Sequence, residues 1–303
     1  MSKPLKQNAY FHLHTAVLLA GGTGLFGRLI TIGELPLVWF RVVISAVLLV
    51  AILAITRKLS RPTTKEALMM LWCGALLSIH WVFYYGSIKA ANISIGAVCF
   101  SLVGIMTAVI EPLMAHRRPM LREVLLGMLP VVGIALIFGV DAQYRLGIGL
   151  GIISSLIYTF YSIRCKKVQA DSSQSSSVML LYEMIGGTVV LGIAMPVYAK
   201  LFPSVALMPQ NNDIWFLLLF AAVFTILPFL LQLLALRNIS AFTVNLTYNL
   251  ETVYTILFAM ILFNEASELN WSFWVGMLLI VASVAMQTIL SIRREKTKIT
   301  SDN

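Results

Sequence analysis

The sequence predicts an all-α polytopic membrane protein with ten transmembrane helices, arranged as two inverted repeats of five helices each. Three observations predict this fold class: the composition, the regular recurrence of long apolar segments, and the distribution of basic residues between them. Of the 303 residues, 59% are hydrophobic and 12% are charged, and the mean hydropathy is +0.88. A soluble domain carries about 25% charged residues. The apolar surface of this chain is therefore expected to face lipid.

Ten apolar segments are long enough to cross a bilayer, which takes about 20 residues of helix. Helices are expected throughout, because the hydrocarbon core offers no partners for open backbone groups. The fifth segment is short and the fourth and ninth contain polar residues, so nine spans are the alternative. The predicted spans are 12–31, 35–55, 66–88, 92–114, 123–140, 146–164, 177–198, 213–235, 240–262 and 271–291.

The basic residues fall mainly on one side of this arrangement. Seventeen of the 22 Lys and Arg residues lie in one set of loops and tails, whereas only Lys89, Arg145 and Lys200 lie on the other side. Arg28 and Arg41 lie inside spans. Loops rich in Lys and Arg stay in the cytoplasm. We therefore expect a multi-pass protein of the cytoplasmic membrane with both termini in the cytoplasm, and we ascribe the net charge of +9 to topology rather than to nucleic acid binding.

A short motif recurs about half a chain apart. The third span ends in Ser87-Ile88-Lys89-Ala90-Ala91-Asn92-Ile93-Ser94, and the eighth ends in Ala235-Leu236-Arg237-Asn238-Ile239-Ser240. A span with polar residues follows each copy. Since five spans per half is an odd number, the halves 1–142 and 143–303 must insert with opposite topology. Inverted repeats of this kind are frequent in transporters, whose substrate site lies near the midplane between the halves.

At these residues the chain resembles the drug/metabolite transporter superfamily, and within it the EamA-type permeases. The resemblance is carried by Pro36-Leu37-Val38-Trp39-Phe40-Arg41, by the junction at 235–240, and by Asn264-Glu265 followed by Gly276. The first half has His116-Arg117 where the family has Gly-Glu, and the first span lacks the family's Trp. The resemblance implies ten helices in two repeats, a cavity formed by spans 1, 3, 4, 6, 8 and 9, and export of amino acids, related metabolites or drugs.

Ionisable side chains inside the spans are the first candidates for function, because each costs about 2.5–3.5 kcal/mol to insert. Glu251 lies near the middle of the ninth span, roughly 15 Å from either face at a rise of 1.5 Å per residue. It is the strongest candidate for the substrate site. Further candidates for coupling or structural roles, by the same argument, are Glu183, Arg41, Arg28 and Glu111. We favour a structural role for Arg41.

Polar residues accompany Glu251 on one side of the ninth span, where residues three or four apart are neighbours. They are Asn245, Tyr248, Asn249, Thr252 and Thr255. This side either lines a cavity or holds helices together through hydrogen bonds.

Aromatic residues form a second group of cavity candidates. His80, Trp81 and Tyr84 lie on the third span, and Tyr158 and Tyr161 on the sixth. These rings would stack on a substrate, with His80 as a proton carrier. The alternative is aromatic packing near the membrane interface, where Trp and Tyr are frequent.

Other motifs carry little weight. Gly22-Thr23-Gly24-Leu25-Phe26-Gly27 matches the dinucleotide fingerprint, but no acidic residue follows in 43–54. Close packing of helices explains the glycines better. The three cysteines have no metal-ligand spacing. We expect no cofactor, no metal and no enzymatic activity.

The sequence thus predicts a secondary transporter that exports a small organic metabolite by alternating access, with proton coupling through Glu251, Glu183 and His80 as a further hypothesis. The alternatives are an importer of a sugar or nucleotide-like solute, a membrane enzyme or lipid-handling protein, and a membrane scaffold. The expected partners are a small-molecule substrate and the lipid bilayer.

Overall fold

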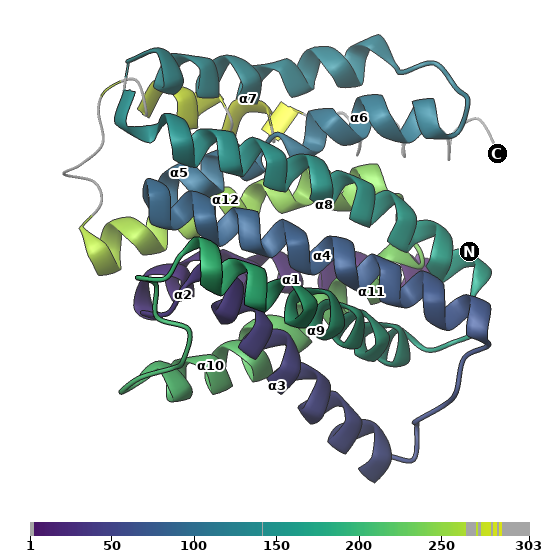
Figure 1. The fold of residues 1–303 in the computed structure, drawn as a ribbon. Coiled ribbons are helices and arrows are strands. Elements are labelled where there is room, and N and C mark those ends of the chain that lie inside the picture. The colour runs from purple at the N-terminus through teal and green to yellow at the C-terminus, as the bar shows by residue number, and fades with distance from the viewer. Residues whose placement is uncertain are drawn as a thin grey trace, which may run out of the picture.

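The structure is a computed structural model that describes residues 3–140, 142–264, 271, 274–279, 281–283 and 285–286. Helices make up all the regular elements of this part of the chain (Figure 1). Their bounds are α1 Lys3–Gly21, α2 Thr23–Leu29, α3 Glu34–Ile55, α4 Thr64–Ala90, α5 Ile93–Phe100, α6 Val103–Met114, α7 Leu121–Val140, η1 Ala142–Tyr144, α8 Arg145–Asp171, α9 Ser176–Leu201, α10 Asp213–Ala221, η2 Ala222–Ile226, α11 Leu227–Leu236 and α12 Ala241–Phe263.

Seven helices of the described part are long and apolar enough to cross a membrane. Two of them, 93–114 and 213–236, combine shorter elements. The predicted first span is divided between α1 and α2, and most of the tenth, 271–291, lies outside the described residues. The count of ten therefore stays a prediction.

Three of the predicted spans are interrupted by local irregularities. The first span breaks at Gly22, whose N–H bonds the carbonyl of Leu19 at 3.1 Å. The fourth breaks at Ser101, whose hydroxyl donates to the carbonyl of Val98 at 2.6 Å. In the eighth, a π-helix over 222–226 precedes Pro228. Proline lacks an N–H and disturbs the hydrogen bonding of the turn before it.

The connections between helices gather at two ends of the bundle. In Figure 1 the loops α3–α4, α6–α7 and α8–α9 lie at the right. Hydrogen bonds tie this end together: Ser60 donates to Gln174 at 2.5 Å, and Arg237 donates to the carbonyl of Gln174 at 2.5 Å. The α3–α4 and α6–α7 loops and the last turns of α8 carry many basic residues, and we call this end of the bundle the basic end.

The opposite end joins the connections α2–α3, α4–α5 and α9–α10. The Thr31 hydroxyl donates to Asp213 at 2.7 Å, and the Lys89 ammonium donates to the carbonyl of Ile32. Tyr198 donates to Glu34 at 3.0 Å. It follows that α1 and α2 run toward this end, whereas α8 runs away from it.

Helix packing has an exchange pattern between the two halves. Helix α4 of the first half packs on α8 and α9 of the second half. Helix α11 of the second half packs on α1 of the first, and α10 packs on α3. Helix α3 also packs on α9, and α5 packs on α12, so these two pairs join corresponding helices of the two halves. When the two halves are exchanged as wholes, so that α1, α3 and α4 take the places of α8, α9 and α10–α11, each of these contacts has a counterpart.

Small residues bring α4 and α9 into close contact. A Cβ atom on Gly74 would overlap the backbone carbonyl of Glu183, and one on Gly186 would overlap the carbonyl of Leu71. Helix α9 runs through Gly186 without a break. Its glycines therefore serve packing rather than a bend.

The repeated motif precedes a helix in both halves, but the capping residue differs. Asn92 caps α5 by accepting the N–H of Ile95 at 2.8 Å, and Ser240 caps α12 by accepting the N–H of Thr243 at 3.1 Å. Both side chains satisfy backbone donors that a helix start leaves free.

Candidate functional site

A small cavity lies between the two halves of the chain. Its lining comes from both: α1, α2, α3, α4 and α5 of the first half, and α8, α11 and α12 of the second. The space for water-sized spheres is about 20 Å³, which is room for about one water molecule. The residues that line it are Ala20, Thr23, Arg41, His80, Trp81, Tyr84, Phe100, Tyr158, Phe229, Tyr248 and Glu251.

Arg41 is fully buried in the wall of this cavity. Its Nε donates to the hydroxyl of Thr225 at 2.7 Å, and its Nη1 donates to the hydroxyl of Tyr85 at 3.1 Å. The guanidinium carbon lies 3.7 Å from the centroid of the Trp81 ring and 4.1 Å from that of Phe220. These contacts stabilise a cation that lipid or a dry protein interior would not.

Glu251 brings a carboxyl group to the same cavity and is 7% exposed. Arg41 lines the same cavity. Among the described residues the cavity is therefore lined by a carboxyl group from the second half of the chain and by the guanidinium of Arg41 and the imidazole of His80 from the first.

Two polar atoms of the lining have no hydrogen-bond partner among the described residues: Nη2 of Arg41 and the hydroxyl of Tyr248. Buried polar groups are nearly always bonded, so such exceptions call for an explanation. Here both atoms belong to side chains that line the cavity, where a bound molecule or a water would supply the missing hydrogen bonds.

His80 links α4 to α8. Its Nδ1 lies 3.0 Å from the carbonyl oxygen of Ser154 and 2.8 Å from the Ser154 hydroxyl, which also lies 3.0 Å from the His80 carbonyl. Because a carbonyl only accepts, Nδ1 carries the proton in this arrangement. His80 is thus held in place by backbone and side chain alike.

The aromatic candidates are buried inside the bundle rather than placed at its surface. Trp81 is 3% exposed and Tyr84 4%. The Tyr158 ring lies 4.8 Å from that of His80 and 4.9 Å from that of Phe100, and its hydroxyl accepts from Gln232 at 2.8 Å. Trp81, Tyr84 and Tyr158 line the cavity.

The polar side of α12 is divided between the cavity and neighbouring helices. Asn245 donates to Thr107 at 2.9 Å and to Ser162 at 2.6 Å, and Thr252 donates to the carbonyl of Ala97 at 2.9 Å. These two side chains connect helices and do not line the cavity. The side chain of Asn249 lies outside the described part of the structure.

Glu183 lies away from the cavity in a second buried polar cluster. Its carboxylate accepts from the Tyr161 hydroxyl at 3.3 Å and from the Cys165 thiol at 3.5 Å. All three side chains are fully buried. Neither Tyr161 nor Glu183 lines the cavity, although the Tyr161 ring lies 5.5 Å from that of Tyr158.

Arg28 and Glu111 lie near opposite ends of the bundle. The Arg28 guanidinium carbon lies 4.9 Å from the centroid of the Phe263 ring. Glu111, near the basic end, interacts electrostatically with Lys166. Neither side chain reaches the cavity.

Sequence reasoning missed several residues that form the site. Thr225 orients Arg41, and the π-helix that carries Thr225 also places its hydroxyl 2.8 Å from the carbonyl of Phe220. The sequence signal that could have pointed to Thr225 was Pro228, which lies just after the π-helix. Such π-helical turns often mark functional positions. Thr23, Phe100 and Phe229 also line the cavity and carry no signal beyond their place in a span.

Comparisons with known proteins agree with this architecture. No curated protein matches the sequence. One solved structure, titled only as the crystal structure of a protein, aligns with a TM-score of 0.67 at 16% identity, covering 94% of this chain and 98% of the other. That likeness shows the fold. Segments 7–139 and 145–289 each match the EamA-like transporter family. The chain therefore belongs to the EamA-like transporter family, a family of membrane transporters of small solutes within the drug/metabolite transporter superfamily.

Proposed function

We propose that this chain is a secondary transporter that exports a small organic solute by alternating access, with the substrate held in the cavity between the halves. The observation that carries the proposal is that Arg41 and Glu251 line the same cavity. A cavity that holds both charges suits a solute that has a cation and an anion of its own.

The substrate class that this pairing favours is an amino acid or a related zwitterion. Its ammonium group would face Glu251, and its carboxylate would accept from the unpaired Nη2 of Arg41 and from the Tyr248 hydroxyl. Charge-assisted hydrogen bonds of this kind are the strong ones. The rings of Trp81, Tyr84 and Tyr158 would contact its side chain.

Movement is part of the proposal, because the cavity has room for about one water molecule in this conformation. Helices of the two halves would have to separate to admit a solute. We propose that the two halves, divided near residue 142, are an inverted pair. The opposite directions of α1 and α8 and the exchange pattern of the packing support this.

We further propose that the basic end faces the cytoplasm, with both termini on that side of the cytoplasmic membrane. The excess of Lys and Arg there supports it. Reporter fusions test this directly: a C-terminal fluorescent protein is expected to fold and an alkaline phosphatase to stay inactive. An active phosphatase would contradict the orientation.

Proton coupling is proposed for Glu251. Its carboxyl could bind either a proton or the substrate's ammonium group, so the two would compete for one site. Competition at one acid is a simple route to proton–substrate exchange. Glu183 is the second candidate, because it is also buried, but it lies outside the cavity.

The test is counterflow in proteoliposomes with a panel of amino acids and related zwitterions, preceded by a thermal-stability screen that detects ligands of the folded state. At least one zwitterion is expected to stabilise the protein and to exchange across the vesicle. If sugars or nucleotides exchange and zwitterions do not, the substrate class is wrong. If no solute exchanges, transport itself is refuted.

A further inference from the structure

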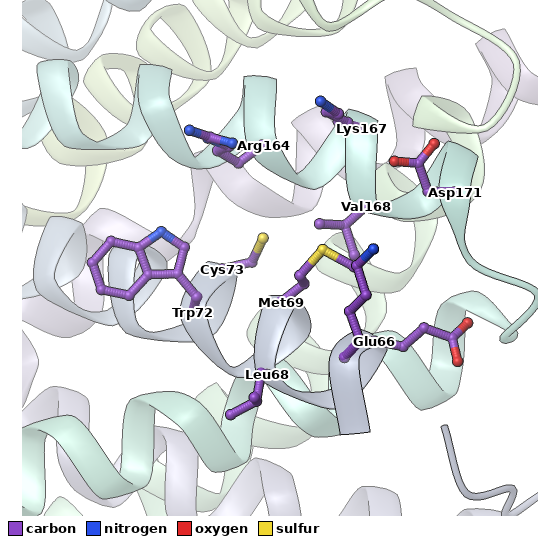
Figure 2. A pocket seen from close by; sticks show the side chains of 10 residues that line it. Glu66, Leu68, Met69, Trp72, Cys73, Arg164, Lys167, Val168 and Asp171 are labelled. Atoms are coloured by element: carbon purple, nitrogen blue, oxygen red, sulfur yellow. The ribbon is translucent and has the colours of Figure 1, made fainter. Parts of the chain in front are cut away.

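A groove outside the transport cavity lies between α4 and α8 at the basic end (Figure 2). Its space is about 600 Å³. Three cationic side chains line it: Lys65, Arg164 and Lys167. All three are exposed, and none forms an ion pair within the described part of the chain.

Two acids, Glu66 and Asp171, also line the groove, which leaves an excess of one positive charge. Glu66 is held by its own helix start, where its Oε2 accepts from the N–H of Thr63 at 2.9 Å, and by the next loop, where its Oε1 accepts from the hydroxyl of Ser172 at 2.8 Å. Figure 2 places Glu66 and Asp171 at one end of the groove and Arg164 beside Trp72 at the other.

The floor and the continuation of the groove are apolar. Leu68 and Trp72 on α4 are 61% and 60% exposed. On α8 an exposed apolar stripe continues from Arg164 toward the middle of the helix. Its members recur at helical spacing and are Ile153, Leu156 and Phe160.

We propose that this groove binds an anionic phospholipid, with its phosphate on Lys65, Arg164 and Lys167 and an acyl chain along the apolar stripe of α8. Basic pockets between membrane helices on the cytoplasmic side bind anionic headgroups. The stripe favours a lipid over a soluble anion, because a free phosphate has no apolar part to cover Leu156 and Phe160. Trp72 would lie at the level of the ester groups, where Trp is frequent.

The site rests on the proposed orientation, which the reporter fusions test separately. Its own test uses fluorescence of Trp72, isolated as the difference between the wild-type protein and Trp72→Phe. Vesicles contain phosphatidylcholine with either brominated phosphatidylglycerol or brominated phosphatidylcholine. Bromine quenches a nearby indole. We expect the brominated phosphatidylglycerol to bind at least about fivefold more tightly, the effect of one basic residue near an anionic surface.

Matched variants locate the effect. The triple variant Lys65→Gln, Arg164→Gln and Lys167→Gln is expected to lose the preference. The control Arg57→Gln, Lys58→Gln and Arg61→Gln removes the same charge from the exposed α3–α4 loop and is expected to keep it. Equal quenching by both lipids in the wild type, or equal loss in both triple variants, would overturn the proposal. Displacement by millimolar glycerol 1-phosphate would assign the groove to a soluble anion instead.

Discussion

The guanidinium carbon of Arg41 lies 3.7 Å from the centroid of the Trp81 ring, and both side chains are buried at the cavity. A desolvated cation over a Trp face is stabilised by about 2 kcal/mol. The arginine therefore has one face on the aromatic wall, two donors fixed by Thr225 and Tyr85, and one nitrogen left for another partner. The proposed function therefore gives this one side chain both a structural and a substrate-binding role.

Replacing Arg41 with Lys keeps the positive charge and removes the contacts that need a guanidinium group. An ammonium cannot stack on Trp81 while donating to Thr225 and Tyr85, since arginine's planar fork makes those contacts. We expect Arg41→Lys to lower the free energy of unfolding by about 1.5–3 kcal/mol and to reduce counterflow at least about tenfold. Thermal melting and counterflow measure the two. The control Arg28→Lys changes an exposed arginine and should stay within about 0.5 kcal/mol; equal effects of both variants would contradict the role of Arg41.

Glu251→Gln keeps the size of the side chain and removes its charge and proton. We expect the variant to fold, to lose most net export, and to lose its response to a pH gradient. In the wild type, an outside-acid gradient should accelerate export, because a proton entering displaces the substrate's ammonium group from the carboxylate. The measurement is efflux of a labelled solute from vesicles of controlled internal pH.

Glu183→Gln is the matched comparison, because it neutralises an equally enclosed carboxyl outside the cavity. We expect the pH response to persist in this variant. If the response disappears in Glu183→Gln and persists in Glu251→Gln, coupling belongs to the Tyr161 and Cys165 cluster.

The contact between α4 and α9 predicts strong sensitivity at Gly74. A methyl group there would overlap the carbonyl of Glu183, which is backbone and cannot rotate away. We expect Gly74→Ala to destabilise the protein by about 1–3 kcal/mol. Gly149 has no atom within 4 Å of a Cβ position, so Gly149→Ala should instead stabilise the helix, by up to about 1 kcal/mol. Thermal melting of the two variants in one detergent compares them, and a drop of equal size in both would refute the packing argument.

His116 follows α6 in the left-handed region, with φ 54°, and Asn264 follows α12 with φ 55°. A left-handed conformation costs a side chain about 1–2 kcal/mol, and glycine is the usual residue at this place. We expect His116→Gly to raise the free energy of unfolding by up to about 1 kcal/mol. A lower melting temperature in this variant would show that the His116 side chain makes contacts that outweigh the backbone strain.

The sequence alone predicted the helical membrane fold, the two repeats and the place of Glu251 at a cavity inside the bundle, because these follow from hydropathy, charge distribution and the cost of burying an acid. It could not tell which polar residues of α12 line the cavity and which bond to neighbouring helices. At about 100° per residue, Asn245, Tyr248, Glu251 and Thr252 all fall on one side, but that side faces both the cavity and the neighbouring helices.

Contacts between distant segments were also beyond the sequence. The hydrogen bond between Arg41 and Thr225 joins residues 184 positions apart, and the contact between His80 and Ser154 joins residues 74 apart. The breaks at Gly22 and Ser101 were missed because a glycine or serine inside an apolar run is equally compatible with close helix packing.

Alternating access of the cavity between the halves is the central claim, and side-specific labelling tests it most directly. Thr23 lines the cavity, so Thr23→Cys would be made in a background in which the buried Cys73, Cys99 and Cys165 are replaced by alanine. A membrane-impermeant thiol reagent is then added to oriented vesicles from one side or the other. The account predicts labelling from both sides, with the rates changed in opposite directions by a transported zwitterion. Labelling from one side only, unaffected by any solute, would contradict it.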